Sequence, residues 1–312
     1  MFVDLKEQYR KSLKTSDTEE HIDLAFYRPI GFAWAYLFRR LGVTPNAVTV
    51  ASIFLGVGAG ICFYFNDLWT NVIGMLLLIW ANSFDSCDGQ LARLTGNYSR
   101  IGRILDGISG DLWFITIYAA ICLRVSTVDP FFSAYPWLIW VIAAINGVCH
   151  AKQAAMADYY RQFHILHVKG KDGSELDRTD ELESRLNALS WSKDFRRKIV
   201  LYFYTNYTRN QEATTPAMQR LRATTDKRWG DKELPETLRQ DFRAASLPLM
   251  KYTNILSFNW RTIALFASLF AGMPYLYFAF ELIVLNALLI YMVHRHEGIC
   301  RRFTQEIEQG KY

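Results

Sequence analysis

Long apolar runs follow one another along most of the chain, and one long polar stretch interrupts them after the middle. A helix needs about 20 apolar residues to cross a hydrocarbon core of ~30 Å, and six runs approach that length. The pattern therefore predicts an all-α, polytopic membrane protein with six transmembrane helices. The expected crossings are residues 46–65, 69–92, 101–123, 132–155, 259–275 and 276–294.

The last two crossings are separated only by Gly272-Met273-Pro274. The apolar run that contains these three residues is about 35 residues long, which is too long for a single crossing. Because Gly and Pro favour tight turns, we predict a helical hairpin that turns at this point.

Residues 24–41 are aromatic and apolar, but this run is short. Arg28 and Pro29 interrupt it, and Arg39 and Arg40 close it. The pattern favours an amphipathic helix at the membrane interface over a seventh crossing.

The polar stretch, residues 158–253, also contains helical patterns. Asp180 precedes Glu183 by three residues, which is the spacing of a capping box. Apolar and aromatic side chains crowd together at residues 199–204, so we expect this part to pack against the protein core or to lie on the bilayer. The apolar stripe after the capping box is Leu182, Leu186 and Leu189, and further amphipathic pieces lie near residues 195–207 and 235–247.

The chain has a net charge of +5, and its Lys and Arg residues flank the apolar runs. Basic residues beside membrane spans orient them and attract anionic headgroups, so the lipid bilayer explains the charge and no nucleic-acid partner is expected. With a cytoplasmic N-terminus, only Arg124 lies at an outer end. We therefore expect an integral, multi-pass protein of a bacterial inner membrane, with both termini and the polar stretch in the cytoplasm.

These patterns divide the chain into five parts. The five cysteines are scattered without a CxxC pair, so neither a disulfide framework nor a zinc site adds to this division. The parts are a cytoplasmic N-terminus with the interfacial helix (1–42), crossings one to four (43–157), a helical cytoplasmic insertion (158–253), crossings five and six (254–296) and a cytoplasmic tail (297–312).

Four carboxylates lie within two of the apolar runs, at Asp85, Asp88, Asp106 and Asp111. Ionisable groups at membrane depth indicate a functional site. The three-residue spacing of Asp85 and Asp88 puts both on one helix face, where they repel unless a cation lies between them. A short loop, residues 94–101, brings the next helix and its acids to the same cavity, which we expect to face the cytoplasm.

A ligand set of carboxylate oxygens without His or Cys fits Mg²⁺ or Mn²⁺ and is typical of sites that bind phosphates through a metal. Gly89 lets a ligand approach the backbone, and Arg93 can contact a phosphate or the polar edge of a nucleotide. The sequence thus predicts a site for a metal-bound diphosphate.

The segment DSCDGQLARLTGNYSRIGRILD, residues 85–106, resembles the signature of the CDP-alcohol phosphotransferase family. The crossings, the interfacial helix and the Thr44-Pro45-Asn46 start of the first crossing are similar as well. The positions that match the family spacing are Asp85, Asp88, Gly89, Ala92, Arg93, Gly102 and Asp106.

The chain departs from the family pattern at the last acid. The family has a carboxylate four residues after Asp106, where this chain has Gly110, and the acid comes one residue later at Asp111. On a regular helix that shift turns the side chain about 100° from the shared face. A π-bulge near residues 107–110 would return Asp111 to the site. Without the bulge, the general base is unassigned.

The resemblance implies a phospholipid-synthesising transferase. Asp85, Asp88, Asp106 and Asp111 would bind one or two divalent metal ions. Asp111 would also deprotonate the acceptor hydroxyl, which attacks the β-phosphorus of a CDP-alcohol and releases CMP. The residues that would line the nucleotide site are Asp88, Gly89, Ala92 and Arg93.

Two substrate arrangements remain open within the family. CDP-diacylglycerol can react with a polar alcohol such as a polyol phosphate, which we place first, or a CDP-linked headgroup can be transferred to diacylglycerol or a ceramide-like lipid. The resemblance also implies that the chain can form a homodimer.

Two other classes of protein compete with this interpretation. Intramembrane prenyltransferases also bind diphosphates through aspartates, and Asn82 before Asp85 loosely matches their motif. A cation transporter would spread its acids across the bilayer, whereas here they gather at one end.

Other polar residues are weaker candidates. His150 and Lys152 are placed to bind an acceptor phosphate, although for Lys152 we favour a snorkelling side chain at a helix end. Glu281 is expected toward the outer side, away from the metal site. Similar candidates at the start of the fifth crossing are Asn254, Asn259 and Arg261.

Overall fold

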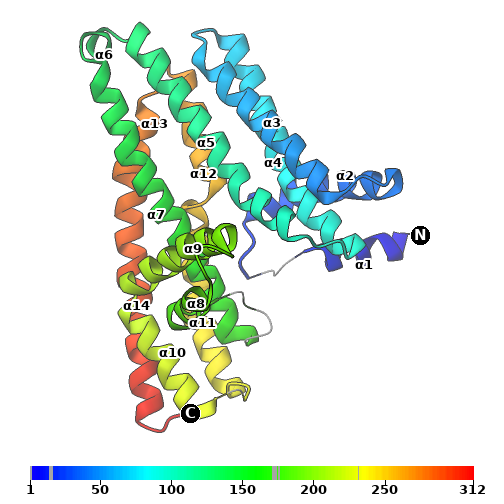
Figure 1. Cartoon of the computed structure of the whole chain (residues 1–312), viewed down its shortest axis with the longest axis vertical. Helices are drawn as coiled ribbons and strands as arrows, with labels where there is room; N and C mark the ends of the chain where they lie inside the picture. Colours follow the sequence, from blue (N-terminus) through cyan, green and yellow to red (C-terminus); the bar gives the residue numbers. More distant parts are fainter. Residues whose placement is uncertain (1, 14–16, 171–173, 175, 231) are drawn as a thin grey trace. The chain divides into compact units, whose positions relative to one another are not determined.

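All regular elements are helices in the part of the chain that the structure describes, residues 2–13, 17–170, 174, 176–230 and 232–312 of a computed structural model (Figure 1). The chain divides into two compact units, Met1–Gly147 with Arg261–Phe280 and Val148–Trp260 with Glu281–Tyr312. The first unit contains α1 (Phe2–Ser12), the π-helical turn η1 (Asp23–Tyr27), α2 (Arg28–Leu41), α3 (Pro45–Tyr64), α4 (Leu68–Thr95), α5 (Arg100–Val128), α6 (Pro130–Ala134), most of α12 (Phe258–Phe270) and α13 (Leu276–Ala279).

The second unit contains most of a long helix, α7 (Pro136–Lys169), and the helices that follow it. Its C-terminal helix continues directly from a π-helical turn. The elements are α8 (Thr179–Ala188), α9 (Phe195–Thr214), α10 (Pro216–Trp229), α11 (Glu236–Ile255), η3 (Phe280–Leu285) and α14 (Asn286–Glu308).

Four helical segments among the described residues are long and apolar enough to cross a membrane. They support an integral membrane protein but fall short of the six crossings predicted. In α4, the C-terminal half carries Asp85, Asp88 and Arg93, while α12 has only 13 residues and is about 20 Å long. The four segments are Pro45–Tyr64, Leu105–Val128, Pro136–Lys169 and Leu276–Glu308.

Local sequence explains where the helices of the first unit begin. Thr44 caps α3 by accepting a hydrogen bond from the backbone N–H of Ala47. Asp67 caps α4, and hydrogen bonds from the Thr70 backbone and hydroxyl hold the pKa of Asp67 below its usual range. The predicted turn is confirmed, because α12 ends before Gly272, which has a φ of 69°.

Small residues on α3 let α5 approach it closely. A Cβ added at Gly56 would collide with the indole of Trp113, and one added at Gly60 would lie 2.7 Å from Thr116 Cγ2. This spacing of two glycines four residues apart allows backbones to approach in membrane helices. It fixes α3, α4 and α5 as one bundle, since α3 also packs against α4.

Arg124, the basic residue predicted at the outer side, lies buried at the end of α5. Its guanidinium donates hydrogen bonds to the Phe63 carbonyl and to the side-chain oxygens of Asn66 and Asn71. These partners satisfy the buried charge and join the ends of three helices.

The second unit is organised around α7, which continues to Lys169 rather than ending at the predicted residue 155. Within this unit α10 and α11 pack against α14. The carboxylate of Glu297 on α14 accepts hydrogen bonds from the backbone N–H groups of Ala217, at 2.8 Å, and Met218, at 3.2 Å. It therefore caps the N-terminus of α10, which lacks an acceptor of its own.

Helices were expected at three places in the polar stretch, and α8, α9 and α11 lie there. The predicted capping box is wrong, because α8 begins at Thr179, two residues earlier than a cap at Asp180 requires, and has no side-chain cap. Leu182 of its apolar stripe is buried, whereas Leu186 and Leu189 are half-buried. The helices α1, α6 and α10 were not predicted.

Candidate functional site

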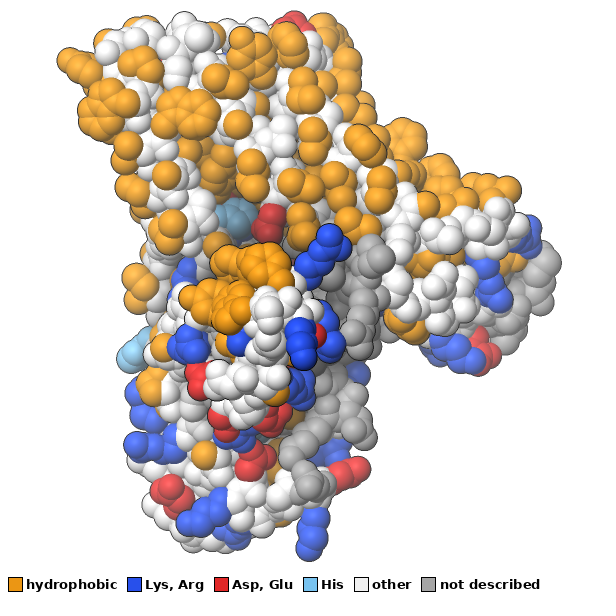
Figure 2. Space-filling model, in the orientation of Figure 1, with side chains coloured by type: hydrophobic (Ala, Val, Ile, Leu, Met, Phe, Trp, Pro, Cys, Tyr) orange, Lys and Arg blue, Asp and Glu red, His pale blue; other side chains and the backbone are white. Residues whose placement is uncertain are grey.

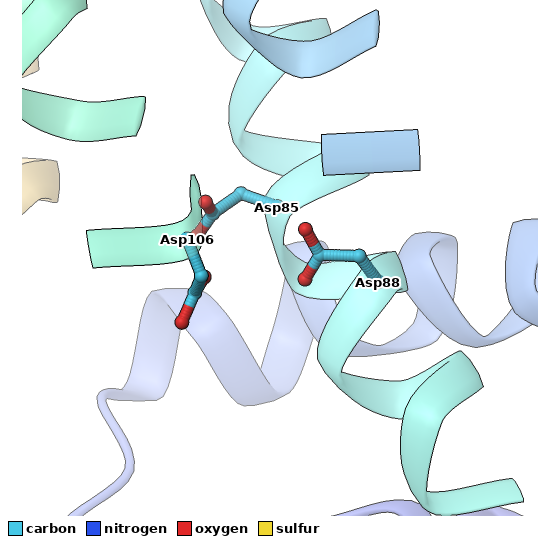
Figure 3. Close-up of side chains that lie close together, drawn as sticks. All are labelled: Asp85, Asp88 and Asp106. Carbon is cyan, nitrogen blue, oxygen red and sulfur yellow. The ribbon is translucent and has the colours of Figure 1, made fainter. Parts of the chain in front are cut away.

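Three of the predicted acids meet between α4 and α5. Asp85 and Asp88 lie one helical turn apart on α4, and Asp106 faces them from α5 (Figure 3). One carboxylate oxygen from each residue lies within 4.8 Å of the others. The two helices thus form one carboxylate cluster, which consists of Asp85, Asp88 and Asp106.

Hydroxyl groups orient the two acids of α4. Thr49 of α3 donates a hydrogen bond to Asp88 Oδ2 at 2.5 Å, and the Ser109 hydroxyl of α5 lies 3.2 Å from Asp85 Oδ1. Thr49, Asp88 and Ser109 are all buried. Asp106, in contrast, is exposed. The cluster is therefore accessible from the side on which Asp106 lies.

The donor set of the cluster fits a hard divalent cation. Three carboxylates at this separation repel one another strongly where water is partly excluded, and a cation between them removes that repulsion. Mg²⁺ and Mn²⁺ prefer oxygen ligands of this kind. The cluster can therefore hold a divalent metal ion.

Asp111 does not belong to the cluster. Of the two alternatives left open for residues 107–110, the structure has the one without a π-bulge, because α5 is regular α-helix from Arg100 to Val128. Five residues of regular helix turn the Asp111 side chain about 140° around the axis from Asp106. The family position itself is Gly110, where an added Cβ would meet no atom within 4 Å.

Gly102 is needed where α5 begins beside α3. A Cβ added there would collide with the side-chain oxygen of Asn46. The Ser99 hydroxyl donates to that oxygen at 3.0 Å and accepts from the Gly102 N–H at 2.8 Å. This contact sets the start of α5 and, one helical turn further on, the position of Asp106.

The N-terminal segment lies against the motif on α4. Arg93 donates from Nε to the Ser12 carbonyl at 2.5 Å, and Gln90 donates to the Ser12 hydroxyl at 3.2 Å. Arg28 donates to Ser86, between the two acids of α4, at 3.3 Å. The Arg93 guanidinium also lies over Gly89, 3.5 Å from where a Cβ would be. Ala92, on the same helix, is half-buried. Of the residues predicted to line a nucleotide site, Arg93 is thus in contact with α1.

Glu19 holds Arg28 in this position. Its Oε2 accepts a hydrogen bond from Arg28 Nε at 2.9 Å, and both side chains are largely buried. Sequence patterns missed this pair because Glu19 and Arg28 lie far from the motif along the chain. One feature of the sequence points to Arg28, which together with Pro29 interrupts an apolar run.

His150, Lys152 and Asn254, among the other predicted polar residues, have structural partners within the second unit. Lys152 donates to Asn210 and Thr214 of α9. His150 Nδ1 lies 3.1 Å from the carboxylate of Glu281, which is fully buried, so Glu281 lies at the same depth as His150. Among the remaining candidates, Asn254 accepts a hydrogen bond from Arg161, and Asn259 and Arg261 are buried.

A cation site made of oxygen ligands on membrane-embedded helices is typical of enzymes that hold a diphosphate through a metal. Residues 42–164 of the chain match the family model described as CDP-alcohol phosphatidyltransferase. The resemblance seen in the motif is thereby confirmed for this segment, which contains α3, α4, α5 and the carboxylate cluster.

A relative from Cereibacter sphaeroides is named CDP-diacylglycerol–glycerol-3-phosphate 3-phosphatidyltransferase. It is 29% identical to this chain over 102 residues, which are 32% of the chain and 43% of the relative. The chain thus spans less than half the length of this curated relative.

Proposed function

We propose that the protein is a divalent-metal-dependent CDP-alcohol phosphotransferase that makes a phospholipid. The observation that carries this proposal is the carboxylate cluster, which lies inside the segment that matches the family model. An acceptor hydroxyl attacks the β-phosphorus of the CDP-alcohol, the bond to the CMP phosphate breaks, and CMP departs with the electron pair.

Asp85, Asp88 and Asp106 would hold the cation, and Thr49 and Ser109 keep the first two carboxylates aimed at it. When bound, Mg²⁺ or Mn²⁺ would neutralise the charge of the diphosphate. Arg93 and Gly89 are proposed to contact the nucleotide beside the cluster, with Ala92 on the same helix. Arg28 adds a second positive charge next to Ser86.

The acceptor hydroxyl must lose a proton to a base. Asp111 was predicted for this role and for a fourth metal ligand, but regular helix geometry turns it away from the cluster. We assign the base to Asp106, because it is the exposed carboxylate of the three and the acceptor can reach it. The role of Asp111 stays a prediction that its Asn variant tests.

We place CDP-diacylglycerol first as the donor and a polyol phosphate as the acceptor. The name of the Cereibacter sphaeroides relative supports this order, since it pairs CDP-diacylglycerol with glycerol-3-phosphate. Transfer of a CDP-linked headgroup to diacylglycerol or a ceramide-like lipid is the second arrangement. Both use the same site and differ in which substrate carries the acyl chains.

The experiment is CMP release by the purified full chain in detergent, with each donor in turn and with or without Mg²⁺. Metal-dependent CMP release from CDP-diacylglycerol plus glycerol-3-phosphate is expected, and EDTA should abolish it until Mg²⁺ is restored. Turnover of an isoprenyl diphosphate without any cytidine nucleotide would instead identify a prenyltransferase. Ion flux without CMP release would identify a transporter.

Two variants on α5 serve as test and matched control. Asp106→Asn is expected to lower turnover by at least about a hundredfold, because it removes a metal ligand and the base. Asp111→Asn is expected to keep most of the wild-type rate. Full activity of Asp106→Asn would contradict the assignment of the cluster, and loss of activity in Asp111→Asn would return Asp111 to the mechanism.

We further propose the topology inferred from the basic residues. In addition to the four apolar segments, α4 and α12 would cross the membrane, and α2 would lie at its interface. Both termini and residues 158–253 would then be cytoplasmic, in line with the five-part division of the chain. The protein is expected in a bacterial inner membrane, and a homodimer is the expected assembly.

A further inference from the structure

The helix α9 presents its apolar side outward and its polar side inward. Along one face, at helical spacing, Val200 is 55% exposed, Phe203 66% and Tyr207 40%. Away from this face, Thr205 and Thr208 are buried, and Gln211 is buried in the last turns of the helix. In water this arrangement is unfavourable, because the aromatic face loses the burial that normally stabilises an amphipathic helix.

Polar contacts hold α9 in this orientation. Gln211 donates a hydrogen bond to the backbone carbonyl of Ala155 on α7 at 2.8 Å. Lys152 of α7 donates to the Asn210 carbonyl at 3.0 Å and to the Thr214 hydroxyl at 2.5 Å. These contacts fix the C-terminal turn of α9 against α7, and the exposed apolar residues Val200, Phe203 and Tyr207 lie in the turns before it.

The docking position on α7 lies at the boundary of a membrane span. Pro136–Lys169 is apolar enough to cross the bilayer, and Lys152 is the first charged residue after its start. Lys and Arg near the ends of spans place their charges at headgroup level. Because α9 is attached at Lys152 and Ala155, it lies at the depth where the hydrocarbon core gives way to headgroups.

Basic and aromatic residues flank the apolar face at the start of α9. Lys193, Arg196 and Arg197 are exposed, as are the aromatic side chains of Trp191 and Phe195. Figure 2 shows a group of hydrophobic side chains over α9 with Lys and Arg beside it. A helix with an apolar face, aromatic residues and adjacent Lys and Arg is typical of elements that lie in the interface of anionic membranes.

We propose that α9 is a membrane-interface anchor whose apolar face, formed by Val200, Phe203 and Tyr207, inserts among the headgroups of the bilayer that α7 spans. The basic residues at its N-terminal end contact anionic lipid. The anchor requires neither a nucleotide nor a metal, so it stands independently of the proposed activity.

The test uses the full chain with a genetically encoded fluorescent amino acid in place of Phe203, reconstituted at one copy per nanodisc. The matched control carries the same fluorophore in place of Lys227, which is exposed on α10. Lipids with a nitroxide near the headgroup are expected to quench the probe at residue 203 by about half and to leave the probe at residue 227 nearly unchanged.

A second variant separates the electrostatic part of the anchor. Charge reversal by Arg196→Glu together with Arg197→Glu is expected to reduce quenching at residue 203 about twofold in phosphatidylglycerol-containing discs and much less in phosphatidylcholine discs. Circular dichroism of each variant checks that the helices persist.

Equal, weak quenching at residues 203 and 227 would overturn the proposal. The same probe is also measured with two copies per nanodisc. If nitroxide lipid does not quench the probe at residue 203 and a second copy shields it from solvent, the face is an interface between copies of this chain. That result would also overturn the proposal. Quenching that is unaffected by charge reversal in anionic discs would refute the role of the basic residues.

Discussion

Thr49 joins the first helix of the bundle to the carboxylate cluster. It donates to Asp88 from a position 39 residues earlier in the chain. Such outer hydrogen bonds fix the orientation of a metal ligand and increase the affinity of the site for its ion. The Thr49 hydroxyl on α3 therefore orients a carboxylate of the cluster, whose three acids lie on α4 and α5.

Thr49→Val keeps the shape of this side chain and removes the hydrogen bond. The variant is expected to lower metal affinity about 10–100-fold, because the Asp88 carboxylate loses its orientation. The Mg²⁺ concentration needed for half-maximal CMP release measures this change. Thr49→Ser restores the hydroxyl and should recover most of the affinity, and a Thr49→Val protein with wild-type Mg²⁺ dependence would refute the role of Thr49.

The sequence predicted the three acids of the cluster but not the residues that orient them. Asp85, Asp88 and Asp106 belong to a signature of 22 residues, and one helical turn separates the first two. Ser109 was within reach of sequence reasoning, because it lies one turn after Asp106 on the same helix. Thr49 was not, since its contact with Asp88 exists only once α3 packs against α4.

Gly110 provides a second test at the residue scale. It lies four residues after Asp106, hence on the same face, and an added Cβ there meets no atom within 4 Å. Gly110→Asp is therefore expected to add a fourth carboxylate and tighten Mn²⁺ binding about tenfold. Electron paramagnetic resonance of bound Mn²⁺ measures the affinity, and unchanged or weaker binding would show that residue 110 faces away from the ion.

At the scale of elements, the contact between α3 and α5 depends on two glycines. Gly56 lies against Trp113 and Gly60 against Thr116, with no room for a side chain at either position. Gly58, on another side of the same helix, has ordinary space, since an added Cβ would lie 3.8 Å from the nearest atom, Leu77 Cδ1. A methyl group therefore fits at Gly58 but not at Gly56 or Gly60.

Gly56→Ala is expected to reduce the free energy of unfolding by about 1–3 kcal/mol, because the added methyl group forces the Trp113 indole out of place. Gly58→Ala is the control and should leave stability unchanged or raise it by up to about 1 kcal/mol through its helix propensity. Thermal unfolding in detergent, followed by circular dichroism, compares the two. Equal stability of both variants would contradict the close contact of α3 with α5.

Apolar periodicity predicted most helices of the protein. At three places the local details of the helices could not be read from the sequence. The capping box at Asp180 does not form because α8 starts at Thr179. The bulge considered at residues 107–110 was left open by the sequence, and α5 is regular helix there. The predicted crossing at residues 132–155 covers only part of α7, because apolar density marks the membrane-spanning part of a helix and not its end.

At the scale of the whole molecule, the carboxylate cluster belongs to the first unit, and the polar stretch builds most of the second. The family match ends at residue 164, near the end of α7. The helices α8 to α11 therefore lie outside the part that the family describes, and the sequence could predict their presence but not their role.

The proposed topology makes a prediction for this second unit. Arg220 and Lys227 are exposed on α10, so trypsin should cleave there in inside-out membrane vesicles and spare these sites in right-side-out vesicles. Mass spectrometry of the released peptides identifies the cuts. Cleavage only in right-side-out vesicles would invert the assignment of both termini and of residues 158–253.

The cap that Glu297 provides for α10 has a consequence for biosynthesis. The carboxylate reaches back across 80 residues to Ala217, so α10 acquires this acceptor only after the ribosome has added the last helix. A nascent or prematurely terminated product that stops before Glu297 presents α10 with a frayed start. We therefore expect such a product to be cut by proteases at the start of α10 more readily than the full chain.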